Sequence, residues 1–163
     1  MAEISKQSAK RQFAKFANAY KKLRGINLVW HAFDERNKEA WDFAGKDTKT
    51  NSVLYVQYTE GIVNQKQKAN IEAHKRGEYE FTYAHGIRHF KKVVEEAYGK
   101  KVKMADKNLA LLIGFHDFGY DVNNKHDDIE SISPHMKKKY GDCAYKEVWI
   151  INQENNSCNL VFE

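Results

Sequence analysis

The feature that most constrains the fold is the apolar run LALLIGF at positions 109–115, because His116 and Asp117 follow it directly. A continuous apolar run indicates a buried segment, and we interpret this one as a helix. An imidazole and a carboxylate at the end of a buried element lose hydration, which is unfavourable unless a hydrogen bond, a cation or a metal compensates. The fold must therefore provide partners for this pair.

Composition favours one domain with an anionic partner. The chain has 163 residues, 42% of them hydrophobic, which is enough for a single core. Its 27 Lys and Arg against 22 Asp and Glu give a net charge of +5, which favours a nucleotide, RNA or DNA only modestly. Cys143 and Cys158 form neither a disulfide framework nor a zinc knuckle, so we expect a reduced, cytoplasmic protein. No apolar stretch approaches the roughly 18 residues of a membrane span, so we expect no membrane partner.

The N-terminal part, residues 1–80, is predicted to be an α/β extension. Apolar residues recur at helical spacing over residues 5–23, and Gly25 ends this helix. Its lysines are interpreted as a solvated face. Residues 26–33 and 53–59 are predicted to be strands, because β-branched and aromatic residues dominate both segments. A long loop over residues 41–52 joins them, and pairing of the two strands is one interpretation of this pattern.

A second helix is predicted over residues 83–99, closed by Gly99. One of its faces carries polar side chains at helical spacing: His85, Arg88, His89 and Lys92. Because 31 residues separate His85 from His116, an antiparallel pair of helices can bring both histidines and Asp117 together. Two imidazoles and a carboxylate suit zinc, iron, cobalt or nickel, and the carboxylate also admits manganese or magnesium.

The segments HGIRH and FHDFGY resemble two motifs of the HD-domain phosphohydrolases. In that family a histidine is commonly followed three residues later by arginine, and an apolar helix ends in the HD pair. The resemblance covers Phe81 to Tyr120, and more loosely extends to Ile151. It implies a predominantly helical domain that holds one or two divalent metals and hydrolyses nucleotides, cyclic nucleotides or other phosphoesters.

By residue, the resemblance implies that His85, His116 and Asp117 bind the metal. Arg88 then becomes a candidate phosphate contact, because the guanidinium fork suits phosphate oxygens, and Lys92 can assist it. A divalent metal in such an open site neutralises the phosphate and lowers the pKa of bound water.

The sequence leaves several candidates for the carboxylate that completes the metal site. Asp142 is the best candidate, although it lies beside a glycine in what can be a loop. Other candidates are spread along the chain: Asp127, Asp128, Asp34, Asp42 and His31. His126 and His135 are spaced like ligands of a second metal, and surface histidines explain them equally well.

The expected fold class is mainly α or α+β, as one domain over residues 1–163. Residues 81–151 form an HD-like helical core, and residues 152–163 form a tail. The segment VWIINQENNSCNLVFE predicts a C-terminal hairpin, whereas a helix over residues 145–153 would suit an HD domain. A hairpin would cut the helical core short.

Two alternatives compete with a hydrolase that acts on a nucleotide or nucleotide-derived phosphoester. In the first, the histidines are structural, and His116 satisfies a backbone carbonyl. In the second, the chain is a basic nucleic-acid-binding or inhibitor-like protein, or a metal-independent ribonuclease. Tyr55 and Tyr58, alternating with basic segments, motivate it because stacking combined with phosphate contacts suits single strands.

Overall fold

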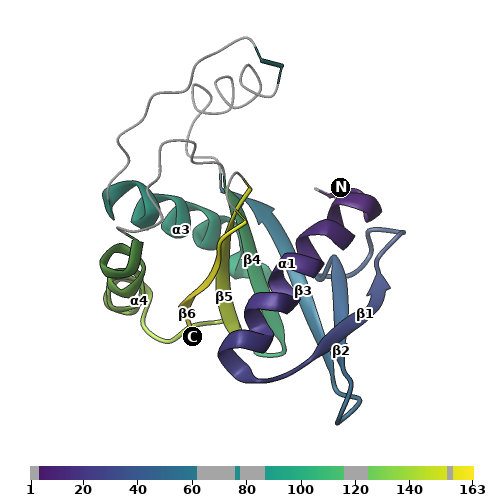
Figure 1. The fold of residues 1–163 in the computed structure, drawn as a ribbon. Coiled ribbons are helices and arrows are strands. Elements are labelled where there is room, and N and C mark those ends of the chain that lie inside the picture. The colour runs from purple at the N-terminus through teal and green to yellow at the C-terminus, as the bar shows by residue number, and fades with distance from the viewer. Residues whose placement is uncertain (1–3, 62–75, 78–86, 116–124, 154–155) are drawn as a thin grey trace.

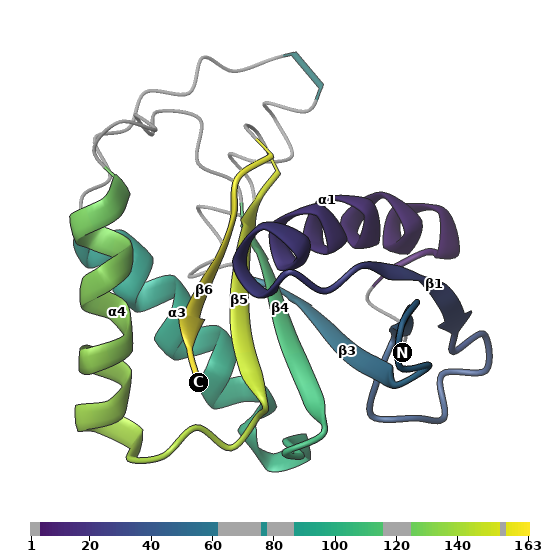
Figure 2. The ribbon, with the colours of Figure 1, turned by 60° about the horizontal axis from the view of Figure 1, so that its bottom comes forward.

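The computed structural model describes residues 4–61, 76–77, 87–115, 125–153 and 156–163. In these residues a mixed six-stranded sheet is covered by three α-helices, which makes the fold α+β. Helix α1 (Lys6–Arg24) lies on one face of the sheet, and α3 (Ile87–Lys101) and α4 (Lys125–Tyr140) lie on the other (Figure 1). The three layers are also clear in Figure 2.

The strands follow one another across the sheet in chain order: β1 (Leu28–Phe33), β2 (Phe43–Asp47), β3 (Val53–Glu60), β4 (Leu109–Phe115), β5 (Glu147–Asn152) and β6 (Cys158–Phe162). Strands β1, β2 and β3 form an antiparallel meander, β3, β4 and β5 are parallel, and β6 pairs antiparallel with β5. The parallel strands therefore have their carboxyl ends at one edge of the sheet.

Strand β4 lies at the centre of the sheet and is buried along its whole length. Successive side chains of a strand point to opposite faces. Leu111 and Ile113 accordingly pack in the core beneath α3 and α4, whereas Ala110 and Leu112 pack in the core beneath α1. Burial on both faces explains why this strand has no polar position, as is usual for parallel strands between helices.

The HD-like helical core expected over residues 81–151 is wrong. Leu109–Phe115 is strand β4, and the segment that could have been a helix after Tyr145 is strand β5. A short apolar run fits a buried helix and a buried parallel strand equally well, and here the seven-residue length suits the strand. Helix α3 also continues past Gly99 to Lys101, and the short 3-10 turn η1 (Val102–Met104) follows it.

The elements predicted near the two ends of the chain agree with the structure better than the predicted helical core does. Helix α1 begins after Ser5, whose side chain accepts a hydrogen bond from the Ser8 backbone N–H, and ends at Gly25 with φ of 69°. The two predicted strands are β1 and β3, but they do not pair, because β2 lies between them within the expected loop. The C-terminal hairpin is confirmed as β5 and β6.

Candidate functional site

The structure describes only some of the residues predicted to bind a metal or a phosphate. His85, His116 and Asp117 lie outside the described residues. Arg88 and His126 belong to the first turns of α3 and α4, and their side chains are also outside the described part. The metal and phosphate site predicted from these residues is therefore not tested by the structure.

Asp142 is placed away from the end of β4 that precedes the HD pair in the sequence. It is exposed in the loop between α4 and β5, and Lys146 of that loop donates its backbone N–H to the carbonyl of Leu109, at 2.8 Å. Leu109 is the first residue of β4, whereas His116 follows the last. Asp142 and the end of β4 thus lie at opposite edges of the sheet, so Asp142 is a poor closing ligand.

A chain of polar side chains lies instead at the carboxyl edge of the parallel strands. The Tyr58 hydroxyl donates to Oε1 of Glu60, at 3.0 Å, and accepts from Nε2 of Gln153, at 3.3 Å. Gln153 directly follows β5, and its amide pairs with the amide of Gln12 on α1 through two hydrogen bonds of 2.8 and 3.0 Å. We call Gln12, Tyr58, Glu60 and Gln153 the carboxyl-edge cluster.

Gly114 of β4 makes room for this cluster. A Cβ atom at Gly114 would lie 2.0 Å from the Tyr58 hydroxyl oxygen and 3.0 Å from Nε2 of Gln153. Gly114 is also the β4 partner of Glu60, and its carbonyl accepts the backbone N–H of Gly61. The missing side chain therefore lets the Tyr58 hydroxyl lie over β4, where it contacts Glu60 of its own strand and Gln153 beyond β4.

Glu60 has the most unusual environment in the cluster. Its Oε2 atom is buried and has no hydrogen-bond partner among the described residues, while Oε1 is held by Tyr58. Leaving a carboxylate oxygen buried without a partner is unfavourable, and native proteins rarely tolerate it without a bound water, ion or functional role. The cluster thus offers a carboxylate oxygen to a cation.

The carboxyl-edge cluster fits a metal only in part. In the described portion of the chain, no group of three or more His, Cys, Asp or Glu side chains is placed to hold a metal ion. Glu60 supplies one oxygen ligand of the kind that hard divalent cations prefer. Any further ligands would have to come from residues that the structure does not describe.

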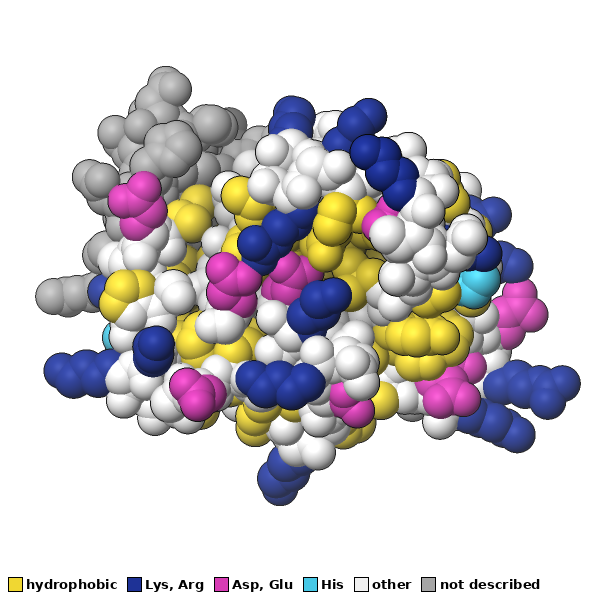
Figure 3. Space-filling model, turned by 90° about the horizontal axis from the view of Figure 1, so that it is seen from below, with side chains coloured by type: hydrophobic (Ala, Val, Ile, Leu, Met, Phe, Trp, Pro, Cys, Tyr) yellow, Lys and Arg dark blue, Asp and Glu magenta, His cyan; other side chains and the backbone are white. Residues whose placement is uncertain are grey.

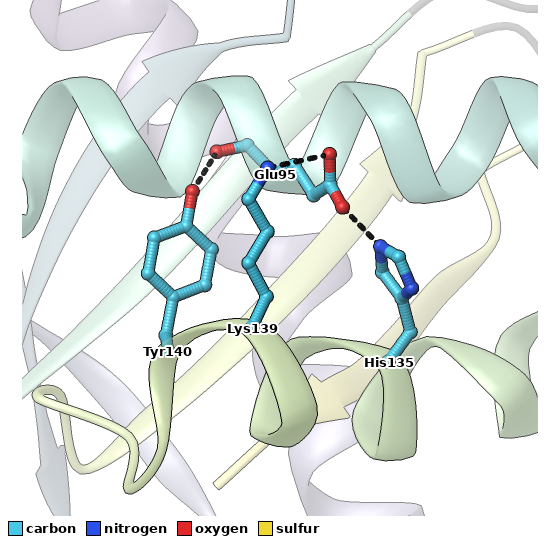
Figure 4. Close-up of polar contacts among 4 residues, drawn as sticks. All are labelled: Glu95, His135, Lys139 and Tyr140. Carbon is cyan, nitrogen blue, oxygen red and sulfur yellow. Dashed lines mark hydrogen bonds and ion pairs between the residues drawn. The ribbon is translucent and has the colours of Figure 1, made fainter.

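His135 has a structural partner. Its Nε2 contacts Oε1 of Glu95, and Lys139 contacts the other carboxylate oxygen at 3.2 Å (Figure 4). The Tyr140 hydroxyl donates to the backbone carbonyl of Glu95, so the three groups tie α4 to α3. Burial raises the pKa of Glu95, but His135 and Lys139 outweigh it and hold this pKa below 4.5. Lys92, the predicted phosphate-binding lysine, is exposed and lines the groove between α3 and α4 together with Glu95 and His135.

The remaining candidates from the N-terminal part do not form a site with one another. His31 is exposed at an irregularity in the pairing of β1 with β2. The Asp34 carboxylate accepts the backbone N–H of Glu39 at 2.8 Å, and that of Asp42 accepts the backbone N–H of Tyr58 at 2.7 Å. Both carboxylates hold the local backbone in place.

Sequence reasoning missed Glu60 because its signal is local and weak. Tyr58 and Glu60 are two residues apart at the end of β3, so they share the face that α1 covers. The alternation is visible in the sequence, but their convergence with Gln153 requires the register of three strands. Sequence patterns seldom determine that register.

Within the described residues no helix is long and apolar enough to cross a membrane. No protein-family model, curated protein sequence or solved structure matches the chain.

Proposed function

We propose that this chain is a metal-dependent phosphohydrolase whose reaction centre lies at the carboxyl ends of β3, β4 and β5. The observation that carries the proposal is the buried Oε2 atom of Glu60, for which the described part of the chain provides no hydrogen-bond partner. In open sheets with parallel strands, ligands bind at the carboxyl ends of those strands. Glu60, Gln153 and the end of β4 all belong to this edge.

The sequence adds the groups that a phosphohydrolase needs. His116 and Asp117 are the next two residues after β4, and an imidazole and a carboxylate are both common ligands of divalent metals. Glu60 then takes the place of the closing carboxylate for which Asp142 was considered. A divalent metal supplies charge neutralisation and an activated water for attack on a phosphoester.

The other members of the cluster orient this carboxylate. Tyr58 fixes Oε1 of Glu60, which leaves Oε2 as the atom for an incoming cation. Gln153 in turn accepts and donates hydrogen bonds with Gln12, so α1 holds the tyrosine through two amides. Such support from outside the ligand set commonly sets the affinity of a metal site.

The test is phosphate release from a panel of nucleotides by protein purified without chelator, with and without added Mn²⁺. We expect Glu60→Gln, His116→Ala and Asp117→Ala each to lower the rate by about 100-fold or more, in the range for catalytic metal sites and their supporting groups. Glu35→Gln is the matched control, because Glu35 is exposed and pairs only with Lys6 among the described residues. Equal rates for Glu60→Gln and Glu35→Gln would contradict the proposal.

A second candidate function, nucleic-acid binding, is favoured by the charge of α1. This helix carries seven basic residues and no acidic residue, so its own net charge exceeds the net charge of +5 for the whole chain. In the described part of the chain no ion pair involves Lys15, Lys21 or Lys22. A single-stranded oligonucleotide should then bind more weakly as salt is raised, and less steeply so in Lys21→Gln/Lys22→Gln. Binding that is absent or independent of salt would exclude this function.

A further inference from the structure

A pocket of about 570 Å³ lies between the second half of α1, Trp149 in the middle of β5, and strand β6 with the residues just before it. This volume is within the range of about 300–1,000 Å³ that small-molecule sites occupy. Trp149 and the turn after β5 form its wall on the sheet side, and the exposed face of α1 forms the other. None of the carboxyl-edge cluster lines it, so the pocket is separate from the proposed reaction centre.

The described residues around the pocket give it a positive charge. Lys15 and Lys22 both line it, and none of the described lining residues is acidic. The two lysines are seven residues apart on α1, so their ammonium groups lie two helical turns apart on one side of the helix. An anionic group that enters the pocket meets two cations and no described carboxylate.

The pocket also has an apolar wall. Trp149 is only 1% exposed and packs against Phe16 and Tyr20, which makes this wall rigid. Leu160 lines the pocket as well, and Leu23 at its rim is 54% exposed, which is high for a large apolar side chain. Leu23 and Leu160 supply the apolar surface that water contacts, and a flat ring placed against them covers it.

Polar groups near the apolar wall give the pocket hydrogen-bond donors and acceptors. Asn156 and Asn159 line the pocket from the turn and from β6, and each amide can both donate and accept a hydrogen bond. Asn156 is held in the turn with φ of 61°, in the left-handed region that asparagine tolerates. In addition, the buried Nε1–H of Trp149 has no hydrogen-bond partner within the residues that the structure describes. The site thus combines cations, an apolar wall and amides, which suit a phosphate, a ring and a heteroatom edge.

We propose that this pocket, named here the α1–β6 pocket, binds a nucleoside monophosphate. The phosphate lies between Lys15 and Lys22, and the base lies along the apolar wall with its polar edge toward the asparagines. Figure 3 shows, for one face of the molecule, hydrophobic side chains exposed among the charged ones. The described lining of the α1–β6 pocket joins apolar side chains to two lysines and holds no acidic residue.

The test is isothermal titration of full-length protein with adenosine 5′-monophosphate in the presence of chelator, which prevents metal-dependent hydrolysis. We expect one binding site, with adenosine alone and inorganic phosphate alone each binding at least about tenfold more weakly. Lys22→Gln should weaken binding by about tenfold, as expected for the loss of one charged hydrogen bond. Lys21→Gln is the matched control, because it removes the same charge from the adjacent residue, which does not line the pocket.

Equal weakening by Lys21→Gln and Lys22→Gln would show that only diffuse charge attracts the nucleotide and would overturn the proposal, as would no binding at millimolar nucleotide. Ala19→Phe fills the pocket from α1 and should abolish binding while the thermal unfolding transition is kept. Glu60→Gln should bind the nucleotide normally. If Glu60→Gln abolishes binding, the nucleotide occupies the carboxyl edge and not the α1–β6 pocket.

Discussion

Replacing Gly114 by alanine is the sharpest test of the carboxyl-edge cluster. The added Cβ would lie 2.0 Å from the Tyr58 hydroxyl oxygen and 2.7 Å from its ring carbon Cζ. Because Tyr58 is only 2% exposed, its ring has little room to move away. Overpacking a core costs about 1–3 kcal/mol, and a lost hydrogen bond to a charged group costs about 1.5–3 kcal/mol. We therefore expect Gly114→Ala to lower the free energy of unfolding by about 3–5 kcal/mol.

Urea unfolding measures this loss, and a second glycine provides the control. Among the described residues, a Cβ at Gly99 in α3 would meet the Tyr140 hydroxyl, at 3.3 Å, and no other atom outside its own helix. Alanine is favoured over glycine in a helix by about 1 kcal/mol, which offsets that contact. We expect Gly99→Ala to change the free energy of unfolding by no more than about 1 kcal/mol.

A double mutant identifies the atom responsible. Tyr58→Phe removes the hydroxyl oxygen that the new Cβ would meet first, so it should recover part of the loss in Gly114→Ala. The coupling energy between the two substitutions should exceed about 1 kcal/mol, as is typical of residues in contact. Strict additivity, or a Gly114→Ala protein as stable as the wild type, would refute the close approach of Tyr58 to β4.

Three further predictions concern buried polar groups. Arg24→Gln should lower the free energy of unfolding in urea by about 3 kcal/mol, because Glu147 is 3% exposed and loses its ion pair of 3.0 Å. An unchanged midpoint of urea unfolding would contradict this prediction. Tyr145→Phe should lower the free energy of unfolding by about 1–3 kcal/mol in the same assay, because its hydroxyl lies 2.6 Å from Oε1 of the buried Gln57. A smaller loss of stability would mean that this hydrogen bond adds little. Burial, with Glu147 nearby, raises the pKa of Tyr20 from 10.0 to about 12. The folded state then binds the proton more tightly, so stability should fall as pH rises from 10 to 12 and fall less in Tyr20→Phe; equal slopes would contradict it.

The sequence predicts those elements whose pattern is local. Helix α1 has a recognisable N-cap and a terminal glycine, and the last hairpin has two β-rich runs around a polar turn. The Leu109–Phe115 run fails as a predictor because its neighbours in the sheet, and not its own residues, determine whether it is a strand or a helix. Strand β2 was missed since glycine, lysine and aspartate dominate FAGKD, and it is a strand because β1 and β3 pair with it on both sides.

The candidate site was less predictable than the fold. The HD pair drew attention to the end of β4, where the carboxyl-edge cluster begins. Glu60 comes from more than 50 positions earlier in the sequence, and only the parallel pairing of β3 with β4 brings it to Gly114. Asp142 illustrates the opposite error, because its position well downstream of the HD pair suggested a ligand that the sheet places at its other edge.

Manganese binding to the full-length protein tests the central claim most directly, namely that the free oxygen of Glu60 serves a divalent cation. Titration followed by electron paramagnetic resonance counts bound Mn²⁺ without any assumption about the substrate. We expect a tight site in the wild type and in Glu35→Gln, with affinity at least about tenfold lower in Glu60→Gln. Equal manganese affinity in all three proteins, or no bound manganese in the wild type, would contradict the claim.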